Sequence, residues 1–573
     1  MKNCKPFIIV PILLFTTFCQ EKHNENIEKY KSESEYGQYA PEDAFFEDER
    51  FAYYGSENQW NRRMFSEKAA NNFYKRRNQR QLLEILDGNI DNAIDQCKSC
   101  IENDKNDLES LFILTIAYCQ IGNINEALNT ANLALDKGFP IERFLVGPRE
   151  LLEPLYNNVE FQAIVNKQNL NILHGPLLGS VTDSSVKIWF RTLKESTIKL
   201  ELFDKDSKKN PINIFENNSI TNDDYTCIIA ISNLEANKKY YYNILVDGIT
   251  ELTNLNFKTY PKRTEKQKIR VSFGGGAGYT PEHESIWNII DSRNPDAMLM
   301  LGDNVYIDLP GFPNSFHDYT YYRRQSSKYF RKLVSHVSTF SIWDDHDAAI
   351  DDVWLGPYLD KPKWKMPTLT HFKINWNNPA YGTDEAPGCY YKFSIGDVDF
   401  IMLDCRFYRT NPFKEDPSMI GPKQKEWLKS VILSLNGTFK VLVSSVPWAK
   451  GAKPGSHDTW DGFDSEREEI FQFIEKNKIE GIILLSADRH RSDAWKIKRE
   501  NGYDFYEFMS SKLTNIHTHE LMQNALLGYN AKCSFGELNF NFDKKEPEVT
   551  YNIINIDGDN INSLTIKHSQ LTF

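Results

Sequence analysis

The sequence predicts a multidomain protein with three successive architectures: an all-α helical repeat, an immunoglobulin- or fibronectin-like β-sandwich, and an α/β layered sandwich. Three observations predict this order. A short pattern recurs within a helical stretch, β-branched runs then follow one another, and finally apolar strands alternate with helical stretches. At 573 residues the chain is too long for a single core, and its 40% apolar content is that of a globular protein.

The charge balance narrows the class of partner. The formal net charge is −12 and the chain has no dense Lys/Arg stripe, whereas neutralising a nucleic-acid backbone needs clustered cations. We therefore expect no direct readout of nucleic acid. A small anionic substrate would need local positive charge from metal ions or arginines.

The first 19 residues have the layout of a targeting segment. Lys2 and Lys5 precede an almost wholly apolar stretch at 7–18, which is too short to span a bilayer, and Cys19 follows at once. This layout resembles a bacterial lipoprotein signal. It predicts an exported protein of the cell envelope, in the periplasm or on the outer surface, lipid-anchored at Cys19. Phe18 departs from the small residue usual at that position, so plain secretion and an uncleaved anchor stay open.

A tether and a repeat follow. Residues 20–79 are expected to form a solvated tether and lead-in, since their first part is polar and rich in Glu, Asn, Lys and Ser. GNIDNAID at 88–95 then returns as GNINEALN at 122–129, 34 residues later. That spacing is the period of tetratricopeptide repeats, so residues 80–165 resemble a short unit of this kind. Two roles fit it, a docking surface for a protein partner and a structural spacer.

The cysteines do not indicate a disulfide framework. Cys4 and Cys19 belong to the targeting segment, and the odd number that remains is scattered along the chain. Cys97 and Cys100 form a CxxC inside a helical pattern, with no second pair and no nearby histidine pair. Packing is therefore favoured over a redox or zinc role for this pair.

Residues 172–260 have the rhythm of an antiparallel sandwich. Short alternating or β-branched runs are separated by turn-forming residues, which favours an immunoglobulin- or fibronectin-type fold. No cluster of acids, histidines or cysteines interrupts the segment, so we expect a non-catalytic companion domain. The runs are SVKIWFRT (185–192), STIKLELF (196–203), YTCIIAIS (225–232) and KYYYNILVDG (239–248).

Residues 268–573 alternate between apolar strands and helical stretches such as 283–293 and 424–435. This alternation predicts an α/β layered domain with buried strands, in which ligands bind beyond the C-terminal strand ends. The expected strands lie in IRVSFGGG (269–276), AMLMLGDN (297–304), FSIW (340–343), VDFIMLDCR (398–406), FKVLVSSVPW (439–448) and GIILLSADRH (481–490).

Polar groups able to bind metal follow three of these strands directly. A lone Asp after a strand is more often a helix cap than a ligand, but three such groups in one domain should meet on one rim. Carboxylates with imidazole and a phenol suit a site for two or more metal ions. The residues are Asp303 and Tyr306 in LGDNVY, Asp345 and His346 in WDDHD, and Asp488 and His490 in SADRH.

These motifs resemble those of the alkaline phosphatase D (PhoD-like) family of calcineurin-like metallophosphoesterases. The resemblance covers 172–573 and rests on the three groups above, on Gly302 and on the LDCRFYR stretch at 403–409. It implies that Asp303 bridges two metal ions, that Tyr306 binds a trivalent ion, and that Asp345 binds the second ion. His346 would be an acid beside the metals, and Asp488 and His490 would complete the metal site.

One departure from the family pattern concerns the first strand. The pattern implies a cysteine ligand shortly after it, where this chain reads Phe273, three glycines and Ala277. The glycine run fits an anion-binding nest of backbone amides and, equally, a tight turn. The candidates to replace the lost ligand are Tyr279, Glu282 and His283.

The resemblance implies metal-dependent hydrolysis of small phosphate esters, as a phosphomonoesterase or phosphodiesterase, by metal-activated water. Oxygen ligands make Ca²⁺ the first expectation, and Tyr306 adds Fe³⁺. His346 would assist the leaving group, and Arg406 would clamp phosphate or form an ion pair with Asp404. The alternative is a degenerate relative that binds metal or phosphate, or docks partners, without turnover.

Other basic residues are weaker candidates for the same site. His517 and His519 in NIHTH fall in a loop-like stretch and stay outside the predicted site. The remaining candidates for phosphate contact are Arg409, Arg489, Arg491, Arg323 and Arg324.

Overall fold

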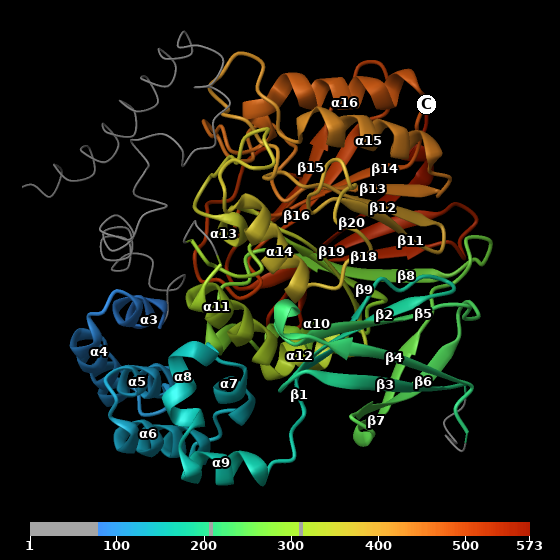
Figure 1. Ribbon diagram of the computed structural model, residues 1–573. Helices are drawn as coiled ribbons and strands as arrows, with labels where there is room; N and C mark the ends of the chain where they lie inside the picture. The colour runs from blue at the N-terminus through green and yellow to red at the C-terminus, as the bar shows by residue number, and fades with distance from the viewer. Residues whose placement is uncertain (1–77, 205–209, 309–312) are drawn as a thin grey trace, which may run out of the picture.

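The computed structural model of the protein describes residues 78–204, 210–308 and 313–573. The predicted targeting segment and nearly all of the predicted tether lie outside the described residues. Figure 1 shows a helical region in blue and cyan, a small β-sandwich in green, and above them a larger body of two sheets that ends in red. No helix within these ranges combines the length and apolar character needed to cross a membrane.

The helical region begins with turns that repeat. Gly88 and Gly122 both have positive φ (81° and 73°), which glycine adopts at little cost, and each follows a helix end. The asparagine after each glycine closes the same backbone hydrogen bond to the preceding helix. The helices are α3 (Gln79–Leu86), α4 (Ile90–Asn103), α5 (Leu108–Gln120), α6 (Ile124–Asp136), α7 (Ile141–Val146), α8 (Arg149–Tyr156) and α9 (Val159–Asn166).

This region packs directly on helix α11 (Ser315–Ser326) of the large body. Arg143 and Glu109 form a buried ion pair, and the hydroxyl of Tyr319 on α11 donates to Glu109 Oε2 (2.9 Å). The guanidinium of Arg143 also lies 5.5 Å from the centre of the Tyr319 ring. The helical region is therefore fixed to the body by buried polar and aromatic contacts.

Two antiparallel sheets form the sandwich, with strand orders β1-β2-β5 and β4-β3-β6-β7. The four predicted runs are β2, β3, β5 and β6. Polar strands β4 and β7 lack the apolar alternation that predicts a strand, and they lie at the edges of their sheet. The bounds are β1 (Ile172–Gly179), β2 (Val186–Thr192), β3 (Ser196–Phe203), β4 (Asn213–Ser219), β5 (Thr226–Ile231), β6 (Lys239–Val246) and β7 (Ile249–Lys258).

The large body consists of a six-stranded sheet, β10-β9-β8-β18-β19-β20, and a seven-stranded sheet, β11-β12-β13-β14-β16-β15-β17. The first contains β8 (Lys268–Gly274), β9 (Ala297–Leu301), β10 (Ser338–Ile342), β18 (Ser534–Asn541), β19 (Glu548–Asn555) and β20 (Asn560–Lys567). The second contains β11 (Tyr391–Ile395), β12 (Val398–Met402), β13 (Phe439–Val443), β14 (Ile482–Ser486), β15 (Ser492–Ile497), β16 (Phe505–Ser510) and β17 (Leu527–Tyr529).

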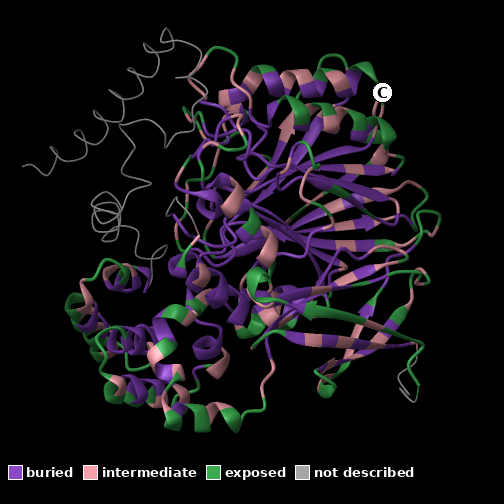
Figure 2. Ribbon diagram, viewed as in Figure 1, coloured by how far each residue is buried: buried purple, intermediate pink, exposed green. Residues whose placement is uncertain are grey.

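Helices cover the outer faces of both sheets, so the central strands are buried on two sides (Figure 2). In β9, Leu299 and Leu301 belong to the core between the sheets, while Met298 and Met300 pack in the core that includes α10. Alternation of side chains along a strand explains this division, and burial on both faces explains why the strand is uniformly apolar. The helices are α10 (Ile286–Ser292), α12 (Lys328–Val334), α14 (Lys365–Asn375), α15 (Gly421–Ser434) and α16 (Asp464–Lys476).

The C-terminal ends of the central strands meet where the two sheets approach each other. A Cβ atom added to Gly275, just after β8, would lie 2.8 Å from Ala487 Cβ after β14 and 3.0 Å from Gly302 O after β9. Gly275 also forms a parallel bridge with Ser511, which follows β16. The expected rim is therefore built from both sheets.

The cysteines that the structure describes all carry reduced thiols. Cys97 is fully buried in the core of the helical region. Burial raises the pKa of its thiol above the usual range, which agrees with a packing role.

Candidate metal centre

Asp303 lies at a sharp turn after β9. Gly302 and Asp303 both have positive φ (99° and 50°), an arrangement that is strained for aspartate. Asp303 Oδ2 accepts a hydrogen bond from the Tyr306 hydroxyl (3.0 Å). Asp303 Oδ1 is buried and has no hydrogen-bond partner among the described residues. Such an oxygen is costly in a protein interior unless a cation approaches it.

Tyr306 connects Asp303 to a second group of residues. Its hydroxyl accepts a hydrogen bond from Asn515 Nδ2 (2.7 Å) and lies 3.4 Å from His490 Nε2. His490 Nε2 is itself 3.9 Å from Asp303 Oδ2. The backbone oxygen of Tyr306 accepts from Gln79 Nε2 (2.7 Å), so helix α3 reaches the back of the centre.

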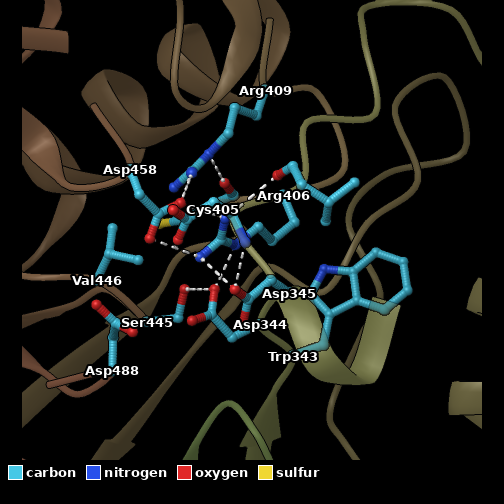
Figure 3. Close-up of polar contacts among 12 residues, drawn as sticks. Trp343, Asp344, Asp345, Cys405, Arg406, Arg409, Ser445, Val446, Asp458 and Asp488 are labelled. Atoms are coloured by element: carbon cyan, nitrogen blue, oxygen red, sulfur yellow. Dashed lines mark hydrogen bonds and ion pairs between the residues drawn. The ribbon is translucent and has the colours of Figure 1, made fainter. Parts of the chain in front are cut away.

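The stretch WDDHD begins a short helix, α13 (Asp345–Ala348), directly after β10. Asp344 and Asp347 form its capping box. Asp344 Oδ1 accepts from Ser445 Oγ (2.8 Å) and from Arg406 Nε, as Figure 3 shows. Asp344 Oδ2 is buried without a hydrogen-bond partner in the described part of the chain. Asp344 is therefore a second carboxylate with an oxygen available to a cation, and the sequence analysis did not select it.

Asp345 and His346 lie beside Asp303, with potential ligand atoms of all three within 4.8 Å of one another. The oxygens of Asp345 accept the backbone N–H groups of His346 (2.9 Å) and Asp352 (2.7 Å). The structure therefore brings Asp345, a predicted ligand, and His346, the predicted acid, close to Asp303.

The imidazole of His346 lies between two carboxylates. Its Nδ1 is hydrogen-bonded to Asp308, and its Nε2 lies 3.0 Å from Asp351 Oδ1. Its ring centre is 4.4 Å from that of Tyr306. Flanking negative charge favours the protonated ring, which is the form that can donate a proton.

Arg406 is fully buried, and its guanidinium forms ion pairs with carboxylates. Beyond Asp344, its NH1 donates to Asp458 Oδ1 (2.6 Å). Only its backbone N–H contacts Asp404 (2.9 Å), so the expected side-chain ion pair goes to Asp344 and Asp458 instead. Direct contact of Arg406 with phosphate would require these pairs to break.

Two further cations lie beside Asp458, of which Figure 3 shows Arg409. Arg409 NH1 contacts Asp458 Oδ1, and Lys453 Nζ lies 3.4 Å from Asp458 Oδ2. Burial alone would raise the pKa of Asp458, but Arg406, Lys453 and Arg409 hold it well below its usual range. The carboxylate of Asp458 therefore has its counter-charges within the protein.

Asp488 and His490 follow β14 in a strained turn, with φ of 66° and 47°. The turn is held by the backbone: Ala487 N donates to Ser445 O (3.2 Å), and Ser511 Oγ accepts from His490 N (2.6 Å). Asp488 Oδ2 is buried without a hydrogen-bond partner among the residues described, although Arg489 lies 3.6 Å away. Strain of this kind persists where a site fixes the backbone.

The three strand-end carboxylates Asp303, Asp344 and Asp488 thus each present one buried oxygen without a hydrogen bond from the described residues. Burial, followed by the nearby charges of Asp345 and Asp344, raises the pKa of Asp303 well above its usual value, against the opposing charge of His346. Hard oxygen donors of this kind fit Ca²⁺ or another hard cation, which would restore the charged carboxylates.

The glycine run lies beside His490. A Cβ atom at Gly276 would be 3.6 Å from His490 Cδ2, but Gly276 has a positive φ of 69°. Of the three replacement candidates, His283 contacts Thr514 O (3.0 Å) and Cys533 Sγ (3.2 Å) through its Nδ1. Neither His283 nor Glu282 belongs to a converging group of potential ligands among the described residues. Tyr279 instead stacks under Arg323, 4.4 Å away.

His517 and His519, which the sequence analysis left outside the site, lie next to His490. The ring centroids of His490 and His517 are 5.1 Å apart, and those of His517 and His519 are 4.6 Å apart. The HxH spacing was the only sequence signal for this group. The sequence of a loop does not show which distant residue its side chains will contact.

Comparisons with known proteins agree with this geometry. Residues 272–552 match the family model of PhoD-like phosphatase. Through these residues, the chain belongs to the PhoD-like phosphatase family. Residues 169–264 match a separate model, a domain of unknown function called DUF7800, which coincides with the sandwich. The family expected from the motifs is confirmed.

Relatives of the PhoD-like family resemble parts of the chain. Alkaline phosphatase D of Bacillus subtilis (strain 168) is 29% identical in an alignment of 333 residues that covers 50% of this chain and 56% of that protein. The chain therefore spans little more than half the length of this curated relative.

Two solved structures share the fold. A structure of PhoD aligns with a TM-score of 0.57 at 15% identity, covering 70% of this chain and 90% of that one. Purple acid phosphatase PPD1 from yellow lupin (Lupinus luteus) aligns with a TM-score of 0.53 at 12% identity, covering 69% and 75%. At these identities the likeness concerns the fold alone.

Proposed function

We propose that the protein hydrolyses phosphate esters in a metal-dependent reaction, as a phosphomonoesterase, a phosphodiesterase or both. One observation carries the proposal: Asp303, Asp344 and Asp488 each present a buried oxygen without a hydrogen bond from the described residues, at the ends of three strands. The match of residues 272–552 to PhoD-like phosphatase supports the same chemistry. Bound metal ions would lower the pKa of water and offset charge on the phosphoryl oxygens.

Each side chain then has a role that follows from its contacts. Asp303 has one oxygen towards Tyr306 and a second without a hydrogen bond, which suits a carboxylate shared between two ions. Asp488 and Asp344 would supply further oxygens, Asp345 lies within 4.8 Å of Asp303, and Tyr306 and His490 lie beside Asp303 Oδ2. His346, held between Asp308 and Asp351, donates a proton to the leaving oxygen.

Arg406 acts as a positioning residue in this proposal. Its buried guanidinium fixes one oxygen of Asp344 and leaves the other towards the metal. This role accounts for a charged side chain that is 0% exposed and engaged on both sides by carboxylates.

The test uses the full chain, stripped with a chelator and assayed on nitrophenyl mono- and diesters with a panel of cations. Asp303→Asn should lower kcat/KM by on the order of 10³-fold, because it removes a charge that holds the metals. Asp291→Asn, which alters ion pairs with the exposed side chains of Lys332 and His336, is the matched control. Full activity after verified metal removal would overturn the proposal.

Metal identity needs its own measurement. Oxygen donors favour calcium, whereas Tyr306 could bind Fe³⁺ as a phenolate. An iron-loaded protein should absorb visible light and lose this band in Tyr306→Phe. A colourless, active protein with stoichiometric calcium supports calcium, and an iron band unchanged by Tyr306→Phe contradicts the assignment of Tyr306.

The remaining proposals concern the N-terminal half. Export and lipidation at Cys19 predict that Cys19→Ala releases the protein from the membrane fraction.

The 34-residue repeat supports a tetratricopeptide-like unit, and the antiparallel sandwich supports an immunoglobulin-like domain. The contacts of α3 and α5 with the large body favour a bracing role over a freely exposed docking surface for a protein partner.

A further inference from the structure

Three histidines gather at the edge of the metal centre. Potential ligand nitrogens of His490, His517 and His519 all lie within 4.8 Å of one another. The ring centroids of His490 and His519 are 5.6 Å apart, and the pairs with His517 are closer still. His490 is buried, whereas His517 and His519 are half-buried, so the group is open to solvent on one side.

The loop that carries two of these histidines is fixed by hydrogen bonds. Thr514 N and Asn515 N both donate to Gly276 O (3.3 and 3.2 Å). Asn515 Oδ1 accepts from His517 N (2.9 Å). Further along, Asn530 Nδ2 donates to His519 O (2.9 Å). The imidazoles are thus presented by a backbone that is already ordered.

The position of this loop coincides with the departure from the family pattern. Gly276 stands where the pattern implies a cysteine, and its carbonyl group anchors the loop. The space for its missing Cβ lies 3.6 Å from His490. The chain therefore lacks the thiolate and adds two imidazoles at the same edge.

We propose that His490, His517 and His519 form a binding site for a divalent transition-metal ion, with Zn²⁺ as the best fit. Imidazole nitrogen suits Zn²⁺ and its neighbours in the first row, while Ca²⁺ prefers oxygen. Three protein ligands with an open fourth position is the arrangement of catalytic zinc sites. Nitrogens around tetrahedral zinc stand roughly 3.3 Å apart, so binding draws the rings together by side-chain rotation.

The site shares His490 with the proposed hydrolytic centre, but its other two donors, His517 and His519, lie outside that centre, and its readout is metal binding. His490 lies between the two groups, since its Nε2 is 3.4 Å from the Tyr306 hydroxyl. Zinc held here stands beside the carboxylate centre and adds positive charge at its mouth.

Metal binding to the full-length protein tests the site. Metal-free protein is titrated with Zn²⁺ in a calorimeter and with Co²⁺ as a visible probe, in the presence of saturating Ca²⁺ to fill the oxygen site. Wild type and the double variant His517→Ala/His519→Ala are compared. His336→Ala, which changes an exposed histidine outside the group, is the matched control.

Wild type and His336→Ala should bind one equivalent of Zn²⁺ that the double variant does not retain. Loss of an outer-shell partner alone costs about 10–100-fold in affinity, so removal of two direct ligands should cost at least about 100-fold. The visible band of four-coordinate Co²⁺ should disappear in parallel. Equal Zn²⁺ stoichiometry and affinity in wild type and the double variant overturn the site.

X-ray absorption at the zinc edge of the wild type keeps the test independent of variant folding. Multiple scattering from about three imidazoles is expected for one zinc per chain. A shell of oxygen donors without imidazole scattering overturns the proposal. Loss of Zn²⁺ binding with unchanged Ca²⁺-dependent turnover separates this site from the proposed function.

Discussion

Buried polar groups lie on two sides of Asp303, and different interactions stabilise them on each side. On one side, which we call the arginine side, Asp344, Asp345 and Asp458 lie with Arg406, Arg409 and Lys453. On the other, the histidine side, Tyr306 and Asn515 lie with His490, His517 and His519. Most acids of the arginine side have internal counter-ions, whereas the histidine side consists of imidazoles, a phenol and an amide.

The comparison separates acids whose charge is balanced by protein cations from acids that would be stabilised by a metal ion. Three cationic side chains already balance the charge of Asp458, so this carboxylate does not need a metal ion. Asp344 has one oxygen held by Arg406 and Ser445 and another without a hydrogen bond from the described residues. The acids of this cluster therefore differ in how much they would gain from a cation, and the buried oxygens without a hydrogen bond from the described residues would gain most.

The largest expected effect concerns the arginine side. Arg406→Leu should lower the free energy of unfolding by about 3–5 kcal/mol, because it leaves the buried carboxylate of Asp344 without its cation and removes one of the three cations beside Asp458. Lys423→Ala, which breaks an exposed pair with Glu385, should cost about 0–1 kcal/mol. Urea denaturation of both variants measures the difference. A loss below about 1 kcal/mol for Arg406→Leu would contradict a structural role for this side.

The next effect separates chemistry from metal binding. His346→Ala should lower turnover of esters with poor leaving groups by about 10²-fold or more, with little loss on nitrophenyl esters and little change in metal content. The reason is that the imidazole held between Asp308 and Asp351 is the proposed proton donor to the leaving oxygen. Equal losses on both substrate classes, together with metal loss, would make His346 a ligand instead.

A smaller effect follows from the raised pKa of Asp303. Because the metal-free carboxyl holds its proton above the ordinary value of about 4, cation binding must displace that proton. Calcium affinity should therefore rise with pH from about pH 4 upward, by up to about tenfold per pH unit, until Asp303 ionises without metal. Calorimetry in buffers of different ionisation enthalpy measures the released proton. Affinity independent of pH would exclude Asp303 as a ligand.

The smallest effect tests the brace from the helical region. Gln79→Ala removes the hydrogen bonds to Tyr306 O (2.7 Å) and Thr320 Oγ1 (3.3 Å). A buried acceptor left unpaired costs about 1 kcal/mol, so kcat should fall roughly fivefold if Tyr306 shifts. Gln162→Ala, which removes an exposed hydrogen bond to Tyr156 O, should leave kcat unchanged. Equal kcat in both variants would confine the helical region to a spacer role.

The order of elements was predictable because each carries a local signal. The buried strands of the large body read as apolar runs, and the ends of β9, β10 and β14 read as charged breaks. The polar strands β4 and β7 gave no such signal, because edge strands that face solvent need no apolar alternation. The sequence also did not predict how the central strands are divided between two sheets, since local sequence does not encode which strands pair.

Most of the elements, the family, and the acids and imidazoles at the strand ends were predictable from the sequence alone, because these depend on periodicity and residue type. Only the tertiary structure decided their partners. Arg406 turned out to hold Asp344 and Asp458, His346 to lie between Asp308 and Asp351, and His517 and His519 to meet His490. The physical reason is that metal binding and acidity depend on charge, burial and hydrogen bonds over a few ångströms, and those distances join residues far apart in the chain.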